Sequence, residues 1–144
     1  MVIQRWQTVW LLMAAILAVV FCFLPMALVS DAMASPESVT FIRPTDLPVL
    51  FVVDGVVALL LFIAIFLYKN TARQRTVTLV SMLLIVVVMV TEVCYLLSWD
   101  AGAGARVEWL GSIFLLLGAL VSAVLAYRGI RHDERLLRAA DRLR

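Results

Sequence analysis

Two acidic residues, Asp54 and Glu92, lie inside long apolar stretches of the chain. An ionisable side chain within a membrane-spanning helix is costly and marks a functional site by default. Both lie less than about 10 Å from the same end of their expected helices, at 1.5 Å per residue. If the two carboxyl groups meet, they cannot both ionise cheaply, so one would hold a proton at neutral pH. The pair therefore suits a proton or cation site.

A structural role is the alternative for these two acids. Each could pair with Arg43 or Arg106 in the loops beyond the expected spans, or stay neutral and hydrogen-bonded. Sites so close to the membrane surface are also open to water. Both acids directed at one polar cavity would favour transport, whereas pairing with these arginines would favour structure.

The other reactive side chains predict no catalytic, cofactor or metal site. Cys22 and Cys94 lie in apolar stretches, where buried thiols behave as small hydrophobic groups. His132 is the only histidine and has no neighbours at metal-ligand spacing. The sequence contains no nucleophile elbow, glycine-rich phosphate loop, CxxC pair or HExxH motif. We therefore expect a protein that is not an enzyme.

The composition predicts a membrane protein. Of the 144 residues, 65% are hydrophobic and 15% are charged, and the mean hydropathy is +1.07. Soluble domains are nearer half apolar and a quarter charged. Stretches of about 20 apolar residues, enough to cross the hydrocarbon layer as helices, occur at 8–28, 48–68, 77–97 and 109–127. We expect an all-α polytopic membrane protein, with one domain over 1–144: a four-transmembrane-helix bundle and a basic amphipathic C-terminal helix over 128–144.

The basic residues predict the orientation of this bundle. Ten of the twelve lie near the N-terminus, between the second and third spans, or in the C-terminal tail; the other two are Arg43 and Arg106. By the positive-inside rule, we expect both termini and the loop at 69–76 of this multi-pass protein to face the cytoplasm. The net charge of +2 is too small to suggest binding to nucleic acid.

The N-terminal region also has features of a secretory signal. It has Arg5, an apolar run and the triplet Ala-Met-Ala at 32–34, which fits an A-x-A cleavage site. The apolar run of about 20 residues is longer than the core of a usual signal peptide. We therefore expect the first span to be kept.

Polar and small residues form stripes on two of the expected helices. One stripe, within about 100° of the third helix, is predicted to face the bundle interior; it comprises Thr78, Ser81, Glu92 and Tyr95. The other, within about 40° of the fourth helix, predicts a helix-packing face towards the bundle or a partner; it comprises Gly111, Gly118 and Ser122.

The C-terminal tail is the most organised polar segment. As a helix it carries an apolar arc of about 160° with most of the arginines opposite, and Glu134 and Arg138 form a favourable i,i+4 pair. Basic amphipathic helices next to a span commonly lie on the lipid surface; docking to a partner is the alternative. The arc comprises Leu136, Leu137, Ala139, Ala140 and Leu143.

Three segments carry a family pattern: QRWQTV at 4–9, FLYKN at 66–70 and the tail from 130 to 144. They resemble the domain-of-unknown-function 4293 family, small uncharacterised four-span membrane proteins of Bacteroidota-type bacteria. The resemblance covers nearly the whole chain, and the tail is its most specific part. It implies the four-span architecture and no activity, because the family has none assigned.

All three segments fall on the expected cytoplasmic side. We therefore predict an accessory or assembly subunit that docks another membrane-protein subunit, or a second copy of the chain, through a basic cytoplasmic face. The predicted docking face comprises Arg5, Lys69, Arg73, Arg131 and Arg138. The alternative is a small proton- or cation-coupled transporter or channel that uses Asp54 and Glu92 as an oligomer.

Overall fold

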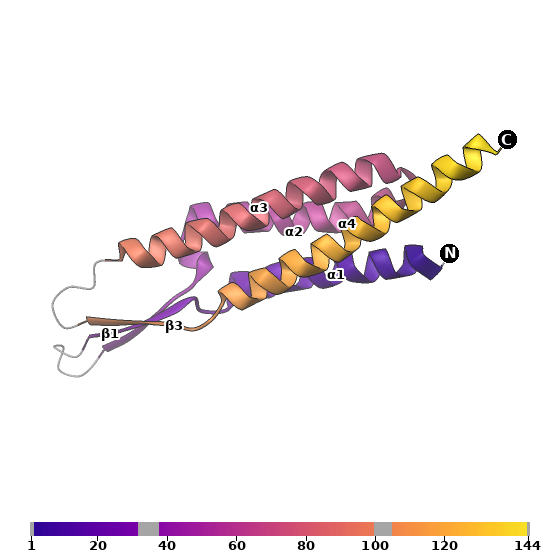
Figure 1. Cartoon of the computed structure of the whole chain (residues 1–144). Helices are drawn as coiled ribbons and strands as arrows, with labels where there is room; N and C mark the ends of the chain where they lie inside the picture. Colours follow the sequence, from indigo (N-terminus) through magenta and orange to yellow (C-terminus); the bar gives the residue numbers. More distant parts are fainter. Residues whose placement is uncertain (1, 32–37, 100–104, 144) are drawn as a thin grey trace.

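The computed structural model describes residues 2–31, 38–99 and 105–143. In this part of the chain, four long helices each contain a segment long and apolar enough to cross a membrane (Figure 1). They are α1 (Val2–Phe23), α2 (Pro48–Phe66), α3 (Thr71–Ser98) and α4 (Ile113–Arg142). The predicted bundle of apolar helices is confirmed, and the protein is a multi-pass membrane protein.

The helices form an antiparallel up-and-down bundle. α1 packs against α2 and α4, and α3 packs against the same two neighbours, so the helices follow one another around the bundle in chain order. The N-terminus and the C-terminus lie at one end, called here the tail end, and the strands lie at the other, called the sheet end (Figure 1).

Local residue types set the limits of α2 and α3. Pro48 begins α2, where its fixed φ suits the first helical position and its missing N–H is not needed. A short 3-10 helix, Leu67–Lys69, leads to Asn70, whose side chain accepts a hydrogen bond of 3.2 Å from the Arg73 backbone N–H. This cap satisfies a donor that the first turn of α3 leaves unpaired.

At the sheet end, three short antiparallel strands in the order β2-β1-β3 replace part of the predicted loops and spans. They are β1 (Ala27–Asp31), β2 (Ser38–Ile42) and β3 (Ala105–Trp109). The first span therefore ends at Phe23 instead of residue 28, and Trp109, predicted to begin the fourth span, lies in β3. β-branched residues such as Val29 and Val107 favour a half-buried strand, which hydropathy alone cannot separate from a helix end.

The polar stripe predicted on the third span faces the interior. Thr78, Ser81 and Glu92 are buried and Tyr95 is half-buried. The two hydroxyl groups donate to carbonyl oxygens one turn earlier in α3 itself, each at 2.9 Å. Because they donate within their own helix, these hydroxyl groups do not join α3 to a neighbouring helix through the donated hydrogen bond.

The amphipathic tail is the direct continuation of the fourth span. α4 runs unbroken for 30 residues, about 45 Å at 1.5 Å per residue, against a hydrocarbon layer of about 30 Å. Figure 1 shows its last turns extending past the other helices at the tail end. The tail therefore leaves the bundle along the axis of its own span, without a turn between the span and the tail.

Candidate functional site

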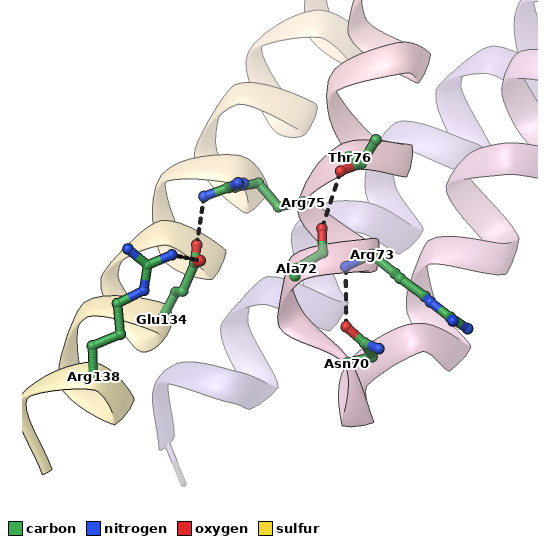
Figure 2. A network of polar contacts seen from close by, with 7 residues as sticks. All are labelled: Asn70, Ala72, Arg73, Arg75, Thr76, Glu134 and Arg138. Carbon is green, nitrogen blue, oxygen red and sulfur yellow. Dashed lines mark hydrogen bonds and ion pairs between the residues drawn. The ribbon is translucent and has the colours of Figure 1, made fainter. Parts of the chain in front are cut away.

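At the tail end, polar side chains from two helices hold α4. The Gln7 side-chain amide of α1 donates to Asp133 at 2.5 Å. From α3, the Arg75 guanidinium donates to Glu134 at 2.7 Å, as Figure 2 shows. Two consecutive acids of α4 are therefore fixed to two different helices, which sets the direction in which the following turns project.

Glu134 is the centre of this network. Its second carboxylate oxygen accepts from Arg138 at 2.5 Å, so the i,i+4 pair predicted from the sequence is confirmed. The Glu134 side chain is only 12% exposed, while Arg138 is 71% exposed. One half-buried negative charge thus has two positive partners, and the charge of the cluster as a whole stays positive.

Close packing of α1 on α4 allows the Gln7 contact. A Cβ atom at Gly129 would lie 2.8 Å from Cγ of Gln7, closer than a carbon contact permits. Gln7 itself is buried. A second buried amide, Gln74, donates to the Ala64 carbonyl oxygen at 3.0 Å and joins α3 to α2. The amides at this end therefore fasten the helices to one another.

The predicted docking face is largely exposed at this end of the bundle. Its exposed members are Lys69, Arg73, Arg131 and Arg138. Arg73 points away from Glu134 in Figure 2. Among the described residues, only Arg75 and Arg138 form ion pairs, so three members of this face have no carboxylate partner there. The Arg5 side chain lies outside the described residues.

Two of these basic groups lie near aromatic rings, in the geometry of a cation–π contact. The Lys69 ammonium lies 6.0 Å from the Tyr68 ring centroid, and the Arg131 guanidinium lies 5.9 Å from that of Tyr127. The structure also adds exposed arginines that the sequence interpretation left out of the docking face, although their spacing along the tail could have revealed them. These are Arg128, Arg135 and Arg142.

The projecting end of α4 also exposes apolar side chains. Leu136 is 53% exposed, Leu137 57% and Leu143 89%. A hydrocarbon layer that begins at Ile113 is crossed by about 20 residues of α4, which would leave these leucines outside it. An exposed apolar stripe outside the lipid region is typical of an interaction surface.

At the sheet end, the two intramembrane acids have separate partners. The Cys22 thiol donates to Asp54 at 2.8 Å, which joins α1 to α2. The Ser112 hydroxyl donates to Glu92, which joins α3 to the start of α4. Both acids are buried, and each carboxyl group contacts a neutral donor, with no hydrogen bond between the two acids among the described residues.

The alternative pairing of these acids with loop arginines is also absent from the described residues. Arg43 and Arg106 are exposed, and neither forms an ion pair in the described ranges. Ser112 instead places Glu92 beside the N-terminus of α4, where the helix dipole favours a carboxyl group. Glu92 therefore helps to anchor the start of this helix.

Each acid nevertheless keeps one oxygen without a partner in the described structure: Oδ1 of Asp54 and Oε2 of Glu92. The cavity beside Glu92 has a volume of about 10 Å³, at the lower limit for one water molecule. This space can hold at most a proton or one water next to the carboxyl group.

The small residues of the fourth span lie against α1. A Cβ atom at Gly118 would lie 3.2 Å from a methyl group of Leu17, and the buried Ser122 donates to the Gly118 carbonyl oxygen at 2.8 Å. Gly111 does not belong to the same helical face, because it lies in the turn before α4 with φ of 77°. Glycine adopts that left-handed conformation without strain.

Comparison with protein-family models identifies the family of the chain. The model of the family described as "Domain of unknown function (DUF4293)" matches residues 3–143, nearly the whole chain. No curated protein is similar enough to the chain to count as a relative. The chain belongs to the DUF4293 family.

Proposed function

We propose that this DUF4293 protein is an accessory or assembly subunit of a bacterial inner membrane, without catalytic activity, that docks a partner protein through its basic cytoplasmic face. The observation that carries the proposal is the projecting end of α4, whose arginines and leucines are exposed. The excess of basic residues at the tail end supports a cytoplasmic position for both termini.

The contacts at the base of the projecting segment support docking. Asp133 and Glu134 are held by α1 and α3, so residues 135–142, about 12 Å of helix, start from a fixed point. A surface that is already oriented loses less conformational freedom on binding. The bundle would then serve as an anchor that aims the tail at a partner.

The exposed side chains favour a protein as the partner. Leu136, Leu137 and Leu143 are exposed on a helix that continues along its span, whereas a lipid-bound amphipathic helix lies in the membrane plane. Arginines beside an apolar stripe suit a partner with an apolar patch and acidic rim.

Removal of three tail arginines tests this proposal. Replacing Arg131, Arg135 and Arg138 with alanine should release the partner during a mild-detergent pull-down from native membranes, analysed by quantitative mass spectrometry. The matched control removes exposed charge at the sheet end through Arg43→Ala and Arg106→Ala. Unchanged recovery of every associated protein by the tail variant would refute the proposal.

A second candidate function is a small proton- or cation-coupled transporter or channel using Asp54 and Glu92. It is favoured by the unpartnered oxygen on each buried acid, and disfavoured by their separate hydrogen-bond partners. If it is correct, flux into proteoliposomes should exceed that of empty liposomes and fall in Asp54→Asn and Glu92→Gln. Wild-type flux equal to the empty control under either pH gradient would exclude it.

A further inference from the structure

A groove of about 620 Å³ opens between α1 and α2. Its walls come from residues 12–23 of α1 and 51–62 of α2, and they are apolar along the whole length apart from Cys22. Cys22 is buried and already donates to Asp54. The groove therefore offers an occupant apolar contacts only.

Small residues leave this space open. A Cβ atom added at Gly55 would have nothing within 4 Å, and Ala15 and Ala58 lie beside the same opening. Larger side chains at these positions would let α1 and α2 interdigitate. An empty gap of this size would deprive the lining side chains of contacts, so the groove needs an occupant.

The length and depth of the groove match one leaflet of a bilayer. It begins at Phe23, the last residue of α1, and at Phe51, close to the start of α2. It ends at Leu12 and Phe62, about 16 Å further along each helix. Half of the hydrocarbon layer is about 15 Å thick, so a groove that begins at the membrane surface at the sheet end would stop near the midplane.

The short length of the groove favours a lipid chain over a partner helix packed along α1 and α2. A partner helix nearly parallel to α1 and α2 is about 10 Å wide and would contact them over much of the hydrocarbon thickness of about 30 Å. A lipid acyl chain, in contrast, enters from the headgroup side and ends near the midplane. We infer that the groove binds one acyl chain of a phospholipid from the sheet-end leaflet, which fills the gap between α1 and α2.

Photolabelling with a retained lipid tests this inference. The full-length protein is reconstituted with phosphatidylethanolamine carrying a diazirine on one acyl chain, extracted, washed in mild detergent to remove bulk lipid, and illuminated. We expect lipid adducts in peptides covering residues 12–23 and 51–62. Gly55→Phe, whose side chain enters open space, should lower the adduct yield several-fold.

Two further variants complete the experiment. Val87→Phe adds the same side chain to an exposed position on α3 and should retain the wild-type yield. Ala58→Leu fills the groove with a smaller change and replaces Gly55→Phe if that variant does not give a monodisperse, helical protein. The inference is wrong if the wild type retains no photolipid, if adducts fall equally on α3, or if two copies of the chain crosslink through α1 and α2 instead.

Discussion

The two ends of the bundle differ in whether their ionisable side chains are buried or exposed. At the sheet end, Asp54 and Glu92 are buried, and each accepts a hydrogen bond from a neutral group on a neighbouring helix. At the tail end, Glu134 is shared between two arginines, and further basic side chains remain exposed. The carboxyl groups at the sheet end fasten the bundle internally, whereas the surplus positive charge at the tail end is available to a partner.

This contrast shows that an unusual residue in the sequence is a weaker sign of function than a side chain left free to contact a partner. A buried acid in a span is the unusual feature in the sequence, yet Glu92 has an evident structural task at the start of α4. Exposed arginines are common on protein surfaces. Here they lie on the projecting end of α4, whose position is fixed by the contacts of Gln7 and Arg75. The proposed function therefore depends more on the fixed position of the exposed arginines of α4 than on the unusual placement of Asp54 and Glu92 within spans.

The largest effect is expected at the sheet end. Ser112→Ala removes the donor to Glu92 and leaves a buried carboxyl group without a partner, which should lower the free energy of unfolding by about 1–3 kcal/mol. Thermal unfolding of the purified protein in detergent measures the change. Ser98→Ala, which removes an exposed hydroxyl bonded within α3, should have little effect. Equal midpoints for the two variants would mean that Glu92 does not anchor α4.

A matched pair of glycine variants compares the two ends directly. Gly129→Ala forces Cβ against Gln7 and should destabilise the bundle by about 1 kcal/mol, at the low end of overpacking costs. In Gly55→Ala the added Cβ atom has no other atom within 4 Å. This variant should stabilise α2 slightly, because alanine has a higher helix propensity than glycine. The same thermal assay checks both, and a stable Gly129→Ala protein would show that α1 does not need close approach at the tail end.

The smallest effects concern the ion pairs at Glu134. Arg75→Ala removes the partner that comes from another helix and should cost about 0.5–1 kcal/mol. Arg138→Ala removes a more exposed partner on α4 itself and should cost less than about 0.5 kcal/mol. A larger loss for Arg138→Ala would show that the inter-helix contact does not fix the base of the tail.

Much of this architecture could be predicted from the sequence because its signals are local. The spans follow from runs of apolar residues, the interior face of α3 from helical spacing, and the pair of Glu134 and Arg138 from i,i+4 spacing. Contacts between distant residues carry no such signal. Gln7 and Asp133 are 126 positions apart, and Arg75 and Glu134 are 59 apart. The partners of Asp54 and Glu92 were missed for the same reason.

The strands were missed for a different reason. Each has five residues, and β1 lies so close to the end of α1 that its apolar residues merge with those of the span. Their alternation becomes visible only once antiparallel pairing brings Val29 opposite Thr40 and Val107. A short strand beside a membrane helix is therefore hard to separate from the end of that helix by hydropathy.

Site-specific photocrosslinking in native membranes tests the proposed docking end most directly. A photoreactive phenylalanine analogue replaces Leu137 on the projecting end of α4 or, as the matched position at the sheet end, the exposed Phe41 of β2. Our account predicts a discrete protein adduct from position 137 that is absent from position 41. Adducts to lipid alone at position 137, or the same protein adduct from both positions, would contradict it.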